Sequence, residues 1–553
     1  MTAVSKPENE PFHPKPVRYD AVVVGAGFSG LRMLHELREL GMTAIVVEDA
    51  DDVGGTWWWN RYPGARTDSE SWYYCYSFSD KILAEWDWSE RFSTQGDVLR
   101  YLQFVADRLD LRKDILLKTR VDSAVYDEVD NNWVVSTNRG HEFEAKFFIS
   151  AMGSLSKPFL PNFKGAEKFQ GHTLMPSRWP DEDIDFTGKR VAVVGTGATG
   201  IQLIPIVAET AAQVTVFQRT PNYVLPARSY TLTSHHMQGI RSRYGDIWDL
   251  AYKQAFGFGI ETIDRPMSMH SEEEINAILQ GGWETGGFRF LFHTFSDIFV
   301  NEETNEVVAK FFRNKVRELV HDPVTAEKLC PRGYPIGGKR PPLGHYYYET
   351  FNRVNVRLID VNEEPIHEIT PTGIRAGDED HDFDIIIYAT GFDAGTGALT
   401  AIDIRGRDGV TLADTWSDGP RTYLGLTVSG FPNFFMLYGP QSVFANVPVV
   451  VELSVNWISK VLQWMKTKRV DRIEPTPESE VAYNERLMEI LHQTVIPKGE
   501  AAGSWFFGSN VPGKPTGPLF EFSGVEAYTA LITQVVDDDL EGFAKSTTTA
   551  AAL

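Results

Sequence analysis

Glycines recur twice in this chain at a spacing that suits the binding of a pyrophosphate. Both copies have the order Gly-x-Gly-x-x-Gly, each after an apolar run rich in valine and before a stretch with helical apolar periodicity. Each copy therefore predicts a strand, a tight turn and a helix whose N-terminus can receive negative charge. An ordinary glycine turn is the alternative for one copy, but two copies in this context favour two dinucleotide sites. The glycines are Gly25, Gly27 and Gly30, and Gly195, Gly197 and Gly200.

The residue that ends the second strand of each unit indicates which dinucleotide that unit binds. Glu48 ends the first, and a carboxylate suits the free hydroxyls of a ribose. Arg219 ends the second, and a guanidinium suits a 2′-phosphate. We therefore expect one cofactor like FAD and one like NADPH, with electron transfer between them. For Arg219 the alternative is a solvated arginine at a strand end.

A loop rich in tryptophan follows Glu48. Glycines and a proline fix its course, three consecutive indoles lie in it, and it ends at Asp68. Indoles could wall a flat ring system, so Gly55, Thr56 and Trp57 are candidate cofactor-binding residues. The alternative is an aromatic core loop with a surface aspartate.

Two further segments carry candidate site residues. Lys339 and Arg340 are followed by proline, and an arginine in a dry pocket keeps its charge and stabilises an anion. A solvated basic turn is the alternative for this pair. Trp505 lies in a glycine-containing loop, where it either contacts a ligand or anchors the loop by packing.

The elements that must position these residues predict an α/β fold. Residues 146–150 and 384–388 read as buried parallel strands that close the two glycine units, whereas residues 228–330 are rich in helix formers. We expect two Rossmann-like dinucleotide-binding domains, one for FAD and one for NADP, and a helical insertion. The expected ranges are 1–18 for an N-terminal extension, 19–155 and 391–545 for the FAD-binding domain, 156–227 and 331–390 for the NADP-binding domain, 228–330 for the insertion and 546–553 for a flexible tail.

Composition excludes several other classes of protein. The chain has 553 residues and a formal net charge of −22, which argues against a nucleic-acid partner. Its 2 cysteines are far apart, which excludes a disulfide scaffold and fits the cytoplasm. The first residues lack a secretory signal and no run approaches a membrane span, so we expect no membrane partner. We also expect no metal site.

Taken in order, these motifs resemble those of type I Baeyer–Villiger monooxygenases, a family of class B flavoprotein monooxygenases. The likeness runs from about residue 19 to about residue 514 and is most specific in the tryptophan loop. It includes the two glycine motifs, Gly54-Gly55-Thr56-Trp57, Tyr62-Pro63-Gly64, Asp68, Phe169-Gln170-Gly171, Trp179-Pro180 and Ala389-Thr390-Gly391-Phe392.

The resemblance implies that FAD, NADPH and dioxygen convert a ketone to an ester or lactone through a flavin peroxide. Arg340 would be the catalytic cation, Asp68 would hold it in place, and Lys339 would lie beside Arg219 at the NADPH 2′-phosphate. Trp505 resembles the tryptophan of the family's closing loop, which touches the nicotinamide ribose and lines the substrate pocket. Residues 439–446 resemble the rim of that pocket, which makes Phe444 a candidate substrate contact.

One position departs from the family pattern. The family motif Phe-x-Gly-x-x-x-His-x-x-x-Trp places Met175 where the histidine belongs, with Trp179 in register. In the family this histidine lies in the linker between the domains and helps to couple them. The nearby His172 is out of register, and we expect it to be a solvated loop residue.

Two other functions stay open from the sequence. One is a class B flavin monooxygenase that oxygenates nitrogen or sulfur, which the Trp179-Pro180 pair and the Asp68 and Arg340 pair disfavour. The other is a non-catalytic dinucleotide-binding sensor, which buried charged groups at a cleft disfavour. We expect a monomer or a weak oligomer whose partners are a small ketone and dioxygen.

Overall fold

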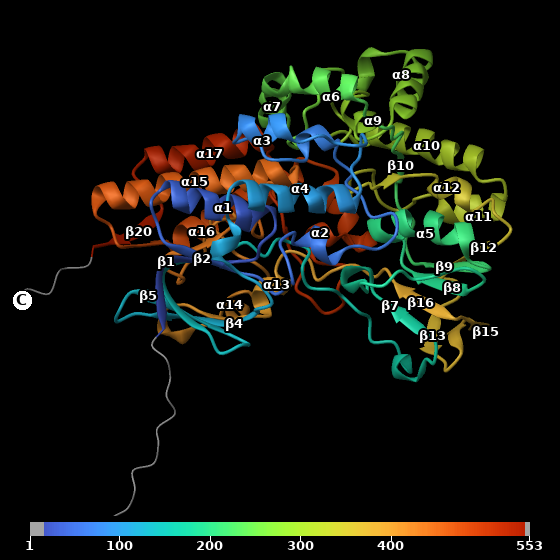
Figure 1. Ribbon diagram of the computed structural model, residues 1–553. Coiled ribbons are helices and arrows are strands. Elements are labelled where there is room, and N and C mark those ends of the chain that lie inside the picture. Colours follow the sequence, from blue (N-terminus) through green and yellow to red (C-terminus); the bar gives the residue numbers. More distant parts are fainter. Residues whose placement is uncertain (1–15, 548–553) are drawn as a thin grey trace, which may run out of the picture.

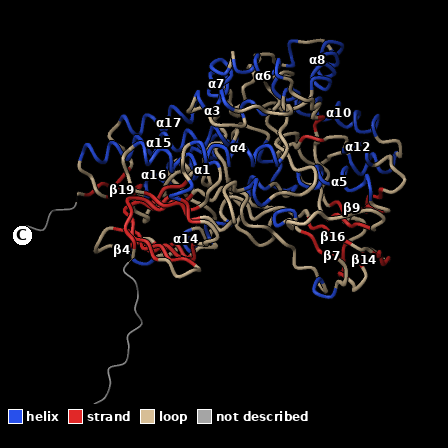
Figure 2. The backbone as a smooth tube through the Cα atoms, in the orientation of Figure 1, coloured by secondary structure: helices blue, strands red, loops and turns tan. Residues whose placement is uncertain are grey.

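The computed structural model describes residues 16–547, whose two large sheets lie apart from each other with a layer of helices over them (Figures 1 and 2). The first sheet has eight strands. Their order is β17 (Asp403–Arg405), β4 (Val121–Asp127), β5 (Asn132–Thr137), β6 (Glu142–Ser150), β1 (Val17–Val24), β2 (Ala44–Val47) and β3 (Ile115–Leu116), with β18 (Phe434–Met436) also beside β6.

Parallel pairing dominates the centre of the first sheet. β1 pairs in parallel with β2 and with β6, and β18 also runs parallel to β6. β5 pairs antiparallel with β4 and β6, so the sheet is mixed on this side. The last four residues of β1 are buried, as expected for a strand covered on both faces.

The second sheet is wholly parallel. Its order is β12 (Val356–Asp360), β9 (Gln213–Gln218), β8 (Arg190–Val194), β16 (Ile385–Tyr388) and β7 (His172–Leu174). Each glycine turn leads from the first strand of its unit into a helix, α1 (Phe28–Glu39) after β1 and α5 (Ala198–Thr210) after β8.

Helices cover one side of both sheets (Figure 1). In this view α1, α4 (Gln95–Arg108), α15 (Val447–Lys468) and α17 (Val525–Asp537) lie above the first sheet, and α15 packs against α1 and α17. The segment predicted as a helical insertion contains α6 (Ser234–Arg241), α7 (Tyr244–Lys253), α8 (Glu272–Thr285), α9 (Arg289–Phe292), α10 (Glu302–Leu319) and α11 (Pro323–Leu329).

The remaining helices and three small sheets complete the structure. The helices are α2 (Thr56–Trp59), α3 (Asp80–Glu85), α12 (Tyr347–Thr350), α13 (Gly397–Thr400), α14 (Leu412–Thr415) and α16 (Pro477–His492). Three small sheets join β10 (Leu225–Pro226) to β11 (Leu343–Gly344), β13 (Ile366–Ile369) to β14 (Gly373–Ala376) and β15 (Glu379–Asp382), and β19 (Arg472–Pro475) to β20 (Phe543–Ser546).

The two parallel cores confirm the predicted α/β fold. β1 begins at Val17, two residues before the expected start of the first domain, and the rest of the expected extension, residues 1–15, lies outside the described residues. The expected tail also lies outside them from residue 548 onward, while Ser546 ends β20. The assignment of residue ranges to domains stays a prediction. Within residues 16–547 no helix combines the length and apolarity that a membrane crossing needs.

Candidate functional site

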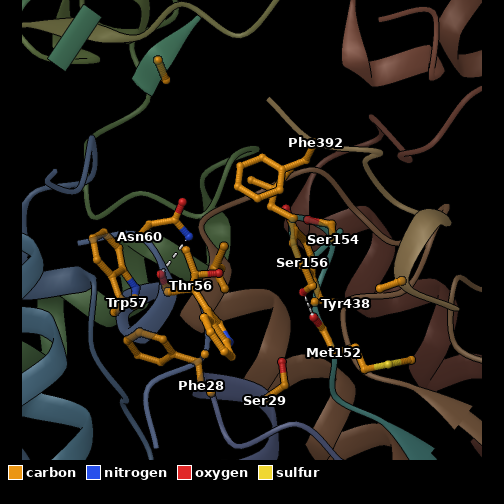
Figure 3. A pocket seen from close by; sticks show the side chains of 18 of the residues that line it. Phe28, Ser29, Thr56, Trp57, Asn60, Met152, Ser154, Ser156, Phe392 and Tyr438 are labelled. Carbon is orange, nitrogen blue, oxygen red and sulfur yellow. Dashed lines mark hydrogen bonds between the residues drawn. The ribbon is translucent and has the colours of Figure 1, made fainter. Parts of the chain in front are cut away.

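A cavity of about 780 Å³ brings together segments that are far apart in the sequence. Its walls come from the turn before α1, the loop from α2 to Asp68, the segment after β6, the start of α5, the helical segment and the C-terminal loops. Figure 3 shows part of it, with Phe28, Thr56 and Trp57 facing Ser154, Ser156 and Tyr438 across the pocket. The volume is in the range of cofactor and ligand sites.

The first glycine turn allows two backbones to approach each other. Gly25 has φ +105°, and a Cβ there would lie 2.7 Å from the Ala151 carbonyl oxygen at the end of β6. A Cβ on Gly55 would lie 2.9 Å from the Cα of Gly27. Side chains are therefore excluded where this turn meets the tryptophan loop, and the second turn repeats the design, since a Cβ on Gly195 would lie 2.4 Å from the Ala389 carbonyl oxygen.

Glu48 braces the first glycine turn and also lines the cavity. Its side chain is buried, and Oε2 accepts a 2.6 Å hydrogen bond from the Ala26 amide. Oε1 accepts a 2.8 Å bond from the Ala50 amide. Burial raises the pKa of Glu48. The expected contact of Glu48 with a ribose stays a prediction, and the structure adds that this carboxylate fixes the turn.

Asp68 and Arg340 lie against each other on the cavity wall. Arg340 Nη1 donates a 2.6 Å hydrogen bond to Asp68 Oδ2, although 272 positions separate the two residues. The Asp68 side chain is 7% exposed and that of Arg340 is 30% exposed, so the cation faces the cavity while the carboxylate is enclosed. Asp68 Oδ1 is buried without a hydrogen-bond partner among the described residues. Asp68 therefore holds the Arg340 guanidinium in a fixed orientation at the cavity and balances its charge, and Asp68 Oδ1 is left as an acceptor for a donor in the cavity.

Arg219 and Lys339 form a second basic site, outside the lining of the main cavity. Lys339 Nζ donates a 3.3 Å hydrogen bond to the Ala502 carbonyl oxygen, and Arg219 Nη2 lies 3.0 Å from where a Cβ on Gly503 would stand. Burial lowers the pKa of Lys339 to about 8, and the charge of Arg219 adds to the shift. Within residues 16–547 neither cation forms an ion pair with a carboxylate, so the site favours an anion.

Aromatic rings also line the cavity. Trp505 begins the short 3₁₀-helix η8 (Trp505–Phe507), and its ring centroid lies 6.2 Å from that of Phe444. Both residues line the cavity, and their predicted contact with the substrate stays a prediction. Trp57 is buried and packs edge-on against Tyr74 at 5.6 Å, while Thr56 is exposed toward the cavity (Figure 3).

Met175 lies between β7 and the 3₁₀-helix η4 (Pro176–Arg178), where it precedes the first helical residue. Its side chain is half-buried, and Trp179 is buried. The guanidinium of Arg178 lies 4.1 Å over the Trp59 ring, which ties this linker to the tryptophan loop. His172 is exposed, as expected of a solvated residue, but it lies in strand β7 and not in a loop, so that part of the prediction was wrong.

The chain resembles known proteins over nearly its whole length. Residues 19–239 match the model of the flavin-binding monooxygenase-like family. A Baeyer–Villiger monooxygenase of Pseudooceanicola batsensis is 42% identical over 94% of this chain and 95% of its own. The chain belongs to the flavin-binding Baeyer–Villiger monooxygenases. Phenazine N-monooxygenase PhzNO1 of Lysobacter antibioticus is also 42% identical, over 95% of this chain and 96% of its own.

A solved structure of this family fixes the cofactors. The OTEMO complex with FAD and NADP superposes with a TM-score of 0.92 at 41% identity, covering 96% of this chain and 99% of that one. This Baeyer–Villiger monooxygenase is accordingly an FAD- and NADPH-dependent enzyme. Its own residues fit a flavin, because Gly25, Gly27 and Gly55 line the cavity where α1 begins and because no donor among the described residues reaches the buried Asp68 Oδ1.

Sequence reasoning missed most of the aromatic wall of this Baeyer–Villiger monooxygenase. The helical segment contributes rings that carry no motif and no periodic signal, and only the folded chain brings them to the cavity. The ring centroids of Phe258 and Phe288 lie 5.0 Å apart, and those of Phe256 and Phe292 lie 5.2 Å apart. The residues that sequence reasoning missed are Phe256, Phe258, Phe288, Leu291, Phe292 and Phe299.

Proposed function

We propose that this enzyme inserts one oxygen atom of dioxygen next to the carbonyl group of an uncharged, apolar ketone and so makes an ester or lactone. The observation that carries the proposal is the Asp68–Arg340 pair on the wall of a cavity that many aromatic rings also line. The cavity residues contributed by residues 256–299 and 444–447 are all uncharged. A charged substrate would lose its hydration there without a partner.

When bound, FAD and NADP supply hydride transfer and the activation of dioxygen. The chain supplies the charge and the dry surroundings. The carbonyl oxygen of a ketone gains negative charge as oxygen adds to its carbon, and we assign the stabilisation of that charge to Arg340. Asp68 holds the guanidinium by the 2.6 Å hydrogen bond, and the aromatic wall excludes water from the reacting atoms.

We assign the remaining residues by their place in the two glycine units. The free Asp68 Oδ1 is left to accept a bond from a cofactor. The assignments are Gly25, Gly27, Gly30, Glu48, Gly55, Thr56 and Trp57 for FAD, Gly195, Gly197, Gly200, Arg219, Lys339 and Trp505 for NADP, and Phe444 and Trp505 for the ketone. We further propose a cytoplasmic monomer or weak oligomer, on the grounds of cysteine content and charge.

Oxygenation of nitrogen is the second candidate, because the phenazine N-monooxygenase is as similar as the Baeyer–Villiger relative. An aromatic nitrogen has no carbonyl oxygen and develops no oxyanion, so that reaction makes no use of a cation placed for one.

The test supplies purified holoenzyme with NADPH and air, and with cyclohexanone or phenazine in separate reactions. Mass spectrometry and chromatography identify the products. We expect the lactone of cyclohexanone, and we expect Arg340→Ala to lose it. Formation of phenazine N-oxide without any lactone would contradict the proposal.

A further inference from the structure

One buried carboxylate joins the Asp68 loop to the helical segment that carries the aromatic wall. Glu70 lies two residues after Asp68, just before the 3₁₀-helix η1 (Ser71–Tyr73), and is 2% exposed. Its carboxylate accepts hydrogen bonds from two arginines that are distant in sequence, Arg91 and Arg289. Charges so enclosed persist in proteins only when they are paired and hydrogen-bonded.

Each of the two arginines makes two contacts with the Glu70 carboxylate. Arg91 Nε lies 2.9 Å and Nη2 2.7 Å from Glu70 Oε1. Arg289 Nε lies 3.2 Å from the same oxygen, and Arg289 Nη2 lies 3.0 Å from Oε2. Several donors per guanidinium fix the orientation of each arginine as well as its distance.

Both arginines hold the turn between α8 and α9. Arg91 Nη1 donates a 2.9 Å bond to the Thr285 carbonyl oxygen at the end of α8, and a 3.2 Å bond to the Arg228 carbonyl oxygen. Arg289 is itself the first residue of α9. Phe288, which precedes α9, and Leu291 and Phe292 within it line the cavity.

The residues that flank Glu70 in the sequence connect it to Arg340 and to other residues of the cavity. Asp68 pairs with Arg340, and Ser69 Oγ donates a 2.9 Å bond to the cavity residue Asn446. Tyr73, at the end of η1, has its ring centroid 5.8 Å from that of Phe258. Glu70 therefore lies in a short stretch that contains Asp68, the partner of Arg340, and that also contacts the α8–α9 turn with its aromatic cavity residues.

We propose that Glu70, with Arg91 and Arg289, is a positioning residue that sets where the substrate lies relative to Arg340, and so sets which product forms. This inference rests on the proposed oxygenation at the Asp68–Arg340 site. Removing the negative charge leaves two cations without their carboxylate, so the α8–α9 turn and its aromatic residues move relative to Asp68. Misplacement of about an ångström can cost on the order of a hundredfold in rate.

The test compares Glu70→Gln and Arg289→Lys with wild-type holoenzyme. The first keeps the shape of the side chain and removes its charge, and the second keeps the charge and loses the planar fork. The matched control is Glu474→Gln, because Glu474 is also a buried carboxylate that accepts from an arginine, Arg407 at 3.1 Å, and neither residue lines the cavity. Melting temperature and retained FAD are measured for all variants.

The probes are racemic 2-methylcyclohexanone, which gives distinguishable lactones, and methyl phenyl sulfide, which gives two enantiomeric sulfoxides. For Glu70→Gln and Arg289→Lys we expect a changed product ratio, a higher KM for the probe and about tenfold less product per NADPH consumed, a smaller loss than a full ångström of misplacement brings. Reduction of FAD by NADPH should change by less than about twofold, because the hydride transfer depends on the cofactor rings. Glu474→Gln should keep the wild-type ratio.

The outcomes distinguish failure of the Glu70 proposal from failure of the proposed ketone oxidation. If product ratio, KM and coupling all stay at wild-type values in Arg289→Lys, or in a folded Glu70→Gln, Glu70 is merely structural and the inference falls. If Glu70→Gln does not fold, Arg289→Lys decides alone. If wild-type enzyme makes sulfoxide and no lactone, the proposed ketone oxidation fails, while the enantiomer ratio of the sulfoxide still tests Glu70. If it oxygenates neither probe, both proposals fall.

Discussion

At the scale of single residues, the proposed chemistry rests on the placement of Arg340. Its guanidinium is held by an enclosed carboxylate yet remains open to the cavity. Loss of one such stabilising donor typically costs on the order of a hundredfold to a thousandfold in rate. We expect Arg340→Ala to lower ester formation by that factor while part of the FAD reduction by NADPH survives, as stopped-flow spectra of the two half-reactions would show.

Two companion variants sharpen that prediction. Arg340→Lys should not restore ester formation, because an ammonium offers a point charge without the planar fork. Asp68→Ala should give a weaker form of the same defect, since Asp68 holds the arginine. Near-normal ester formation by Arg340→Ala would show that another group meets the oxyanion.

Lys339 predicts a pH dependence for the use of NADPH. Burial and the nearby charge of Arg219 lower its pKa to about 8, so the side chain is charged below that pH and loses its proton as pH rises through it. Only the charged form attracts a phosphate. We therefore expect kcat/KM for NADPH, which reports the free enzyme, to fall as pH rises through about 8.

NADH provides the control for Lys339, because it lacks the 2′-phosphate. Its kcat/KM should stay flat over the same range, and Lys339→Met should remove the fall seen with NADPH. An equal fall with both coenzymes would assign the ionisation to some other group.

At the scale of elements, α5 is locked to the tryptophan loop. Tyr62 donates a 2.8 Å hydrogen bond from its hydroxyl to Gln202 Oε1 in α5, and Gln202 Nε2 donates a 3.0 Å bond to the Arg66 carbonyl oxygen. Gly64 has φ +84°, and a Cβ there would lie 2.5 Å from the Gln202 carbonyl oxygen. The start of the second dinucleotide unit thus rests directly on the loop that leads to Asp68.

Gly64→Ala tests this contact. An alanine in the left-handed region costs about 1–2 kcal/mol, and a clash with backbone adds about 1–3 kcal/mol. Gly188→Ala is the matched control, because Gly188 has φ +71° and open space around its Cβ position. We expect the melting temperature of Gly64→Ala to fall well below that of Gly188→Ala. Equal melting temperatures would mean that α5 and the loop separate easily.

The elements divide into those that the sequence predicts and those that it does not. β1 with α1 and β8 with α5 were predictable, because a buried parallel strand is a continuous apolar run and only glycine fits the turn after it. The pairing of Asp68 with Arg340 came from the resemblance. The link from Glu70 to Arg289 was out of reach, because 219 positions separate them and no local pattern joins them.

At the scale of the whole molecule, the cavity depends on both glycine units and on the helical segment at once. A ligand that binds only the folded state stabilises it, by about 2.7 kcal/mol at a hundredfold excess over Kd. We expect NADP⁺ to raise the melting temperature of the FAD-loaded enzyme more than NAD⁺ does. Arg219→Ala should remove the difference between the two, and an unchanged difference would place the 2′-phosphate elsewhere.

The proposed reaction transfers one atom of dioxygen to a ketone. The direct measurement is the reaction of purified holoenzyme with NADPH, cyclohexanone and isotopically labelled dioxygen, followed by mass spectrometry of the product. We expect a lactone that carries one labelled oxygen atom, with one NADPH consumed for each lactone formed. NADPH consumption that yields only labelled hydrogen peroxide, or a lactone without label, would contradict it.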